Sequence, residues 1–170
     1  MKTHPVFLCV DDTMVSKSGK KFENVSKLFN HAAHNGSNYL NGHCFVSIML
    51  CVPVLDHDKI SYLSVPLGYG YRMWQKKESK LELAASMIRQ VMPEFLSKEH
   101  VIILCDSWYT KKNLVSIIDE YPNLDLIGNA RIDSVMYDLA PERTGRRGRP
   151  AKHGKRLCVE TDFTFSKEKI

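Results

Sequence analysis

The stretch VFLCVDDT, residues 6–13, runs five apolar residues directly into Asp11 and Asp12. A second stretch, VIILCDSW at residues 101–108, repeats this pattern and ends its apolar run at Asp106. Short continuous apolar runs predict strands, and we expect the first of them to be buried on both faces. A strand with an acid at its carboxyl end places that acid at the sheet edge where α/β sheets bind ligands.

The two strand ends predict a metal site if their strands are neighbours. Asp11 or Asp12 would then meet Asp106, and carboxylates that close repel unless a cation lies between them. Mg²⁺ and Mn²⁺ prefer such oxygen ligands. Because side chains alternate along a strand, Asp11 and Asp12 point to opposite faces and only one of them can face the metal. An Asp after a strand is also a common turn residue or helix cap, and the spacing alone leaves both interpretations open.

The remaining pattern favours a mixed sheet covered by helices. A helix is expected at residues 79–96, because Ser79 can cap it and apolar residues recur at helical spacing until Pro93 ends the last turn. The other predicted segments are a hairpin of strands at 44–54 and 59–65, a helix at 111–120, strands at 124–130 and 158–165, and loops over most of 22–42 and over 134–155.

Length and composition indicate one globular domain. The chain has 170 residues, of which 44% are hydrophobic and 25% charged. No apolar run is long enough to span a bilayer, and no signal peptide is apparent, so nothing points to a membrane partner or to secretion. The five cysteines form no CxxC pair, and we interpret them as reduced residues of an intracellular protein.

Positive charge is concentrated in one segment. Residues 143–156 hold seven Lys or Arg and no acid, whereas the whole chain has a net charge of +5, so the rest is slightly acidic. Such a segment indicates a polyanionic partner, and its Arg-Gly-Arg-Pro core suits a narrow A·T-rich minor groove. A solvated loop is the alternative. The candidate DNA-binding residues are Lys17, Lys20, Lys21, Arg143, Arg146, Arg147, Arg149, Lys152, Lys155 and Arg156.

Three motifs in order carry a family resemblance. The motifs are DDT at 11–13 followed by KSGKK at 17–21 and KLFNH at 27–31, then DSWY at 106–109, then RTGRRGRPAKHGKR at 143–156. Together they resemble the catalytic domain of DDE insertion-sequence transposases, in the bacterial group with an insertion between the second and third acids. The resemblance implies an RNase H-like α/β fold: a mixed sheet flanked by helices, with the start of a basic loop and β insertion at the C-terminal end.

The same resemblance implies chemistry and partners. Asp12 is favoured as the first metal ligand, with Asp11 as the alternative, and Asp106 matches the second. The implied reaction is Mg²⁺- or Mn²⁺-dependent cleavage of DNA by water, followed by attack of the freed 3′-hydroxyl on target DNA. The implied partners are double-stranded DNA of transposon ends and target, and a homodimer of the full-length protein is left open. The implied location is the bacterial cytoplasm, associated with the nucleoid.

One departure from the family pattern sets the expected domain limits. No acid after the basic segment matches the third catalytic glutamate, so we expect residues 1–133 to be an RNase H-like core without its final helix. Residues 134–170 would be the basic loop and strand of the insertion. A truncated copy of this kind would be inactive alone. The rival hypotheses are a non-catalytic DNA-binding module acting through the Arg/Lys-rich loop, and a small-molecule phosphoesterase, which such a loop disfavours.

Overall fold

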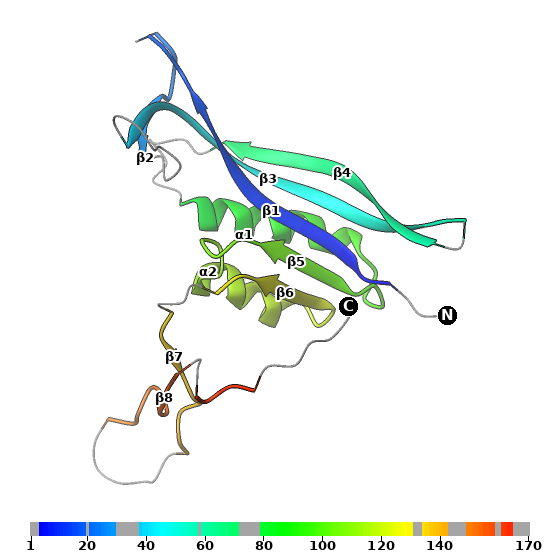
Figure 1. The fold of residues 1–170 in the computed structure, drawn as a ribbon, viewed down its shortest axis with the longest axis vertical. Helices are drawn as coiled ribbons and strands as arrows, with labels where there is room; N and C mark the ends of the chain where they lie inside the picture. The colour runs from blue at the N-terminus through cyan, green and yellow to red at the C-terminus, as the bar shows by residue number, and fades with distance from the viewer. Residues whose placement is uncertain are drawn as a thin grey trace. The chain divides into compact units, whose positions relative to one another are not determined.

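The chain divides into two compact units, Met1–Asn129 and Ala130–Ile170. In this computed structural model the described residues are 4–19, 21–29, 38–57, 59–71, 79–130, 134–142, 149–158 and 161–164. The first unit contains a mixed sheet with its helices, and the second contains a small two-stranded sheet (Figure 1). The predicted domain boundary at residue 133 stays a prediction.

The sheet of the first unit is built around β1, Val6–Ser16. On one side β1 pairs with antiparallel β3, Tyr39–Asp56, and on the other with parallel β5, Val101–Cys105. Three further strands complete the sheet: β2 (Ser26–Phe29) and β4 (Lys59–Tyr71), both antiparallel to β3, and β6 (Leu124–Gly128), parallel to β5. This arrangement of antiparallel strands on one side of β1 and parallel strands on the other is that of an RNase H-like α/β fold, as expected.

The helices form where the sequence predicts them. Helix α1, Lys80–Val91, starts at Ser79, whose side chain accepts from the Glu82 backbone N–H in a reciprocal capping box. The α-helix ends before Pro93, which lies in a 3-10 turn, η2, Met92–Glu94. The second predicted helix is split into α2, Lys112–Val115, and the 3-10 helix η3, Ser116–Glu120. None of the described helices is both long and apolar enough to cross a bilayer.

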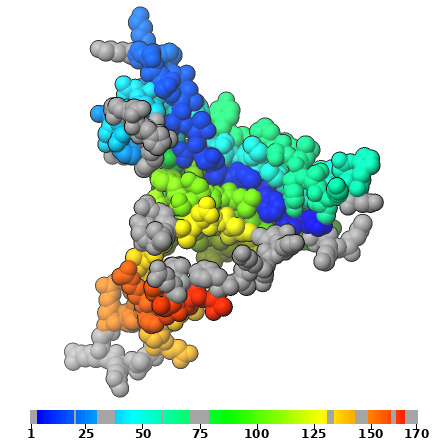
Figure 2. Space-filling view, in the orientation of Figure 1, coloured from blue at the N-terminus to red at the C-terminus, as the bar shows by residue number. Residues whose placement is uncertain are grey.

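The hydrophobic core lies on one face of the sheet. Leu8 and Val10 of β1 are buried with Ile103 of β5 against Ile88 of α1 and Leu114 of α2. The residues between them, such as Phe7 and Cys9, are only half-buried. The prediction that residues 6–10 are buried on both faces is therefore wrong, because both described helices pack against the same face (Figure 1). Figure 2 shows β1 and β3 at the surface of the other face.

The predicted hairpin of strands at 44–54 and 59–65 is formed by the longer β3 and β4, and the strand predicted at 124–130 ends at Gly128 in β6. Other predicted loop and strand limits also differ from the structure. The expected loop at 22–42 contains β2 and the start of β3, which pair with each other from Ser26↔Gly42 to Phe29↔Tyr39. The loop at 134–155 contains β7, Met136–Tyr137, which pairs with β8, Arg156–Leu157. The strand at 158–165 is wrong in its described part, because the Asp162 carboxylate accepts from the Cys158 N–H and folds the backbone into a turn.

Candidate functional site

Asp12 lies inside β1 on the face that carries the core. It follows Leu8 and Val10 at strand alternation, and its side chain is only 13% exposed. Asp11 points to the other face, is exposed, and accepts from the Asp12 N–H at 2.8 Å. β1 continues to Ser16 beyond both acids and remains paired with β3, so the expectation that the strand ends at these acids is wrong. The favoured acid thus sits on a rigid, paired strand and faces the helices.

Both carboxylate oxygens of Asp12 have partners from distant parts of the chain. The Lys80 Nζ lies 2.9 Å from Oδ1 and 2.8 Å from Oδ2, and its side chain is only 17% exposed. The Tyr109 hydroxyl donates to Oδ1 at 3.0 Å, and the Cys44 thiol donates to Oδ2 at 3.6 Å. Burial of a carboxylate away from water costs free energy, and such partners offset that cost. Lys80, at the first turn of α1, supplies the balancing positive charge.

Asp106 directly follows the last residue of β5 and is exposed. Because Cys105 of β5 pairs with Val10 of β1, Asp106 leaves the sheet beside the Asp11–Asp12 segment. Its Oδ1 accepts from the backbone N–H groups of Trp108 at 2.9 Å and Tyr109 at 3.3 Å. Asp106 therefore fixes the turn that leads toward α2, and it does so with one carboxylate oxygen.

Tyr109 contacts both acids. It is fully buried, its hydroxyl donates to Asp12, and its backbone N–H donates to Asp106. Burial raises the pKa of the Tyr109 hydroxyl well above its ordinary value, and the negative charge of Asp12 raises that pKa further. The hydroxyl consequently stays protonated and acts as a fixed donor to the Asp12 carboxylate.

Trp108 packs against the side chains that surround Asp12. Its ring lies 4.3 Å from the Nζ atoms of both Lys80 and Lys111, and it packs edge-on to Tyr109 with 5.2 Å between ring centroids. Sequence reasoning missed both lysines, the Tyr109 hydroxyl and Cys44. One signal was present: Lys80 shares a helix face with Ala84 and Ile88, and a lysine on a buried stripe requires an anionic partner.

The donor set fits a hard divalent cation. Asp12 and Asp106 offer carboxylate oxygens from neighbouring strands, and Mg²⁺ is commonly held by one or two protein carboxylates with water and substrate phosphate completing its shell. Within the described parts of the chain, no three His, Cys, Asp or Glu residues come together as a metal-binding group. A cation at Asp12 would also replace or displace the Lys80 ammonium, which now neutralises that carboxylate.

The candidate DNA-binding residues lie in both units. In the first, Lys17 is half-buried with its Nζ 5.5 Å from the Phe22 ring centroid, and Lys21 is exposed. In the second unit, the described candidates are all exposed: Arg149, Lys152, Lys155 and Arg156. The Lys155 Nζ pairs with the Asp162 carboxylate at 3.0 Å. Four candidates fall outside the described residues: Lys20, Arg143, Arg146 and Arg147.

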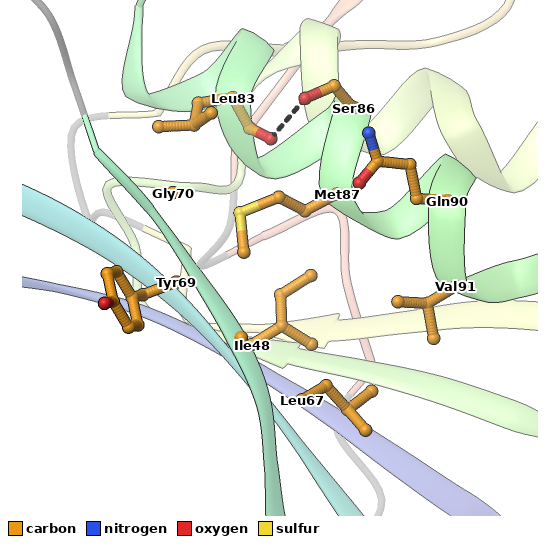
Figure 3. A pocket seen from close by; sticks show the side chains of 10 residues that line it. Ile48, Leu67, Tyr69, Gly70, Leu83, Ser86, Met87, Gln90 and Val91 are labelled. Carbon is orange, nitrogen blue, oxygen red and sulfur yellow. Dashed lines mark hydrogen bonds between the residues drawn. The ribbon is translucent and has the colours of Figure 1, made fainter.

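A separate pocket of about 280 Å³ lies between α1 and the strands β3 and β4 (Figure 3). Its lining is largely apolar and includes no charged residue. The Ser86 hydroxyl in this lining donates to the Leu83 carbonyl at 2.8 Å.

Comparison with known proteins identifies the family. A family model described as DDE superfamily endonuclease matches residues 1–168 of this chain. Among solved structures, a cryo-EM structure of a piggyBac transposase synaptic complex with hairpin DNA is similar, with a TM-score of 0.44 and 14% identity over 75% of this chain. This chain spans 23% of the length of that transposase. The curated proteins contain no match. Because the family model covers nearly the whole sequence, this chain belongs to the DDE superfamily endonucleases.

Proposed function

We propose that the first unit is the catalytic domain of a DDE transposase, in which Asp12 and Asp106 hold Mg²⁺ or Mn²⁺ for DNA strand cleavage and strand transfer. Family membership makes DNA processing related to transposition the general function. The observation that carries the finer proposal is the position of Asp12 in β1 and of Asp106 directly after the parallel strand β5, with Tyr109 in contact with both.

Each side chain of the cluster has a definite part in this proposal. A divalent ion would supply charge stabilisation at the phosphoryl group being transferred. The Tyr109 hydroxyl fixes the orientation of Asp12, and two backbone N–H groups fix Asp106 through one of its oxygens. Lys80 balances the charge of Asp12. In this proposal, a paired strand with a buried tyrosine holds Asp12 for the cation, and an anchored turn holds Asp106.

The proposed substrate is double-stranded DNA, at transposon ends and at the target. Support comes from the seven Lys and Arg of residues 143–156, a segment that contains no acid and in which Lys155 pairs with Asp162 from outside it. If all seven contacted phosphates, the logarithm of the binding constant would fall with the logarithm of salt concentration at a slope of about −6. The phosphate contacts would supply affinity, and they would position the DNA without reading its sequence.

A second candidate function is DNA binding without catalysis, through the Arg/Lys-rich loop. The ion pair between Lys80 and Asp12 favours it, because that carboxylate is already neutralised by a side chain of the same protein. This candidate expects DNA binding that does not depend on a divalent ion.

Calorimetric titration with Mn²⁺ tests the catalytic proposal. We expect the wild-type chain to bind Mn²⁺ and Asp106→Asn to lose binding, since an amide still accepts the backbone N–H groups but is a poor metal ligand. Asp125→Asn is the matched control, because Asp125 is an exposed acid of β6 that pairs with His100. Equal Mn²⁺ affinity of Asp106→Asn and the wild type would reject the proposed metal site. DNA binding by a chain that takes up no Mn²⁺ would favour the second candidate.

Nicking of supercoiled plasmid gives a separate readout. We expect little cleavage even where Mn²⁺ binds, because the described residues offer only two carboxylates at the site. Efficient nicking that Asp106→Asn abolishes would show that a third ligand comes from elsewhere in the chain.

A further inference from the structure

Two lysines share the ring of Trp108, and their charges are balanced differently. Lys80 forms an ion pair with Asp12. Lys111 is exposed, its Nζ lies 4.3 Å from the centre of the Trp108 ring, and no described carboxylate forms an ion pair with it. The indole face attracts an ammonium group but does not neutralise its charge. Lys111 therefore presents a positive charge at a fixed place beside the candidate metal site.

The backbone around Lys111 is anchored to the same turn as Asp106. The Lys111 N–H donates to the Tyr109 carbonyl at 2.7 Å, and the Lys111 carbonyl accepts from the N–H groups of Leu114 and Val115 at 3.0 Å. Leu114 is fully buried, which ties this segment to the core. The position of Lys111 relative to Asp106 is consequently set by the fold of one short, well-anchored segment.

We propose that Lys111, held by Trp108, binds a backbone phosphate of the DNA strand that lies at Asp106. This inference rests on the proposed function, because it takes DNA as the substrate of that site. An ammonium group has three N–H donors, and contact with the face of an aromatic ring leaves donors for a phosphate oxygen. Restricting the lysine beforehand also lowers the entropy lost when the phosphate binds. Lys111 is thus a substrate-positioning residue, and Trp108 positions Lys111.

The neighbouring Lys112 provides a matched control. It is also exposed and carries the same charge, but it lines a different depression together with Glu82 and Arg89 of α1. Replacing either lysine by glutamine removes one positive charge from adjacent positions of the chain. A general effect of net charge would therefore weaken DNA binding equally in the two variants. Loss of a phosphate contact made by Lys111 would weaken DNA binding only in Lys111→Gln.

Fluorescence anisotropy with a labelled, mixed-sequence DNA duplex over a series of NaCl concentrations tests the proposal. We expect Lys111→Gln to weaken binding several-fold and to reduce the magnitude of the salt slope by about 0.9, the change for one phosphate contact. Lys112→Gln should keep the wild-type slope, and Lys111→Arg should restore it. Trp108→Leu should weaken binding, and Trp108→Phe should recover part of the loss because it retains an aromatic face. Urea unfolding of each variant identifies any loss that arises from misfolding.

The outcomes separate this inference from the proposed function. Equal slopes for Lys111→Gln and Lys112→Gln, or a wild-type chain that does not bind the duplex, would overturn the role of Lys111. Mn²⁺ binding by Lys112→Gln should equal that of the wild type. If Mn²⁺ binds but the two glutamine variants behave alike, only this inference fails. If Lys111 alone changes the salt slope while no Mn²⁺ binds, the metal site fails and the phosphate contact stands.

Discussion

Asp12 lies within β1 and Asp106 follows the end of β5, and the two regions hold their acids in different ways. Asp12 is nearly buried, and its partners Lys80 and Tyr109 lie 68 and 97 residues further along the chain. Asp106 is exposed, and its partners are backbone N–H groups two and three residues away. The environment of Asp12 forms only when the helices dock on the sheet, whereas that of Asp106 is a local turn. Tyr109 is the residue that joins them.

The largest expected effect is a loss of stability when the Tyr109 side chain, which contacts both regions, is removed. Tyr109→Ala deletes a fully buried aromatic side chain and should lower the free energy of unfolding by about 3–5 kcal/mol. Tyr109→Phe keeps the ring and loses only the hydrogen bond to Asp12, so it should cost about 1 kcal/mol. Urea unfolding measures both values. Similar losses in the two variants would mean that the hydroxyl, and not the packing of the ring, stabilises this region.

The next largest expected effect is the loss of stability when either acid is replaced, which should differ between Asp12 and Asp106. Asp12→Ala leaves Lys80 and the Tyr109 hydroxyl without their carboxylate and should cost about 2 kcal/mol, less than for a fully buried pair because Lys80 can turn toward water. Asp106→Ala removes an acceptor from an exposed turn and should cost about 1 kcal/mol. Urea unfolding of the two variants gives the comparison. A larger loss of unfolding free energy for Asp106→Ala than for Asp12→Ala would contradict the view that Asp106 stabilises only a local turn.

A third change concerns the ion pair of Asp12. Lys80→Met keeps most of the side-chain stem and removes the ammonium that competes with a cation for Asp12. We expect Mn²⁺ affinity to rise by about tenfold, which corresponds to about 1.4 kcal/mol. Lys98→Met, which removes an exposed lysine from the chain before the start of β5, is the control and should leave the affinity unchanged. Weaker Mn²⁺ binding in Lys80→Met would indicate that Lys80 is needed to orient Asp12 for the metal.

The same contrast explains what the sequence could predict. β1, β5 and α1 are visible because apolar runs and helical periodicity are local patterns, reinforced in α1 by the Ser79 cap. β2 has only four residues, and its pairing with β3 is a tertiary event that its own composition does not signal. The acids are visible because they interrupt or end apolar runs.

The partners of the acids could not be predicted in the same way. The position of Lys80 on the helix stripe of Ala84 and Ile88 shows that it faces the core, but not that it meets Asp12. That pairing depends on how α1 packs across β1. The basic residues of the second unit lie largely in irregular segments, where no periodicity indicates the direction of a side chain. Charge density predicts a partner there without predicting geometry.

The smallest expected effect tests the orientation of Asp106 through its neighbour Cys105. Burial raises the pKa of the Cys105 thiol to about 11, and the charge of Asp106 adds to this rise. Asp106→Asn removes only the second cause, so the pKa should fall but stay above its ordinary value of 9.0. Because the thiolate is the reacting form, the pH midpoint of iodoacetamide labelling should move down, as mass spectrometry of the Cys105 peptide would show. The exposed Cys158 serves as an internal reference. An unchanged midpoint would mean that the Asp106 carboxylate is directed away from the Cys105 thiol, and the β5 end would then present its acid to solvent alone.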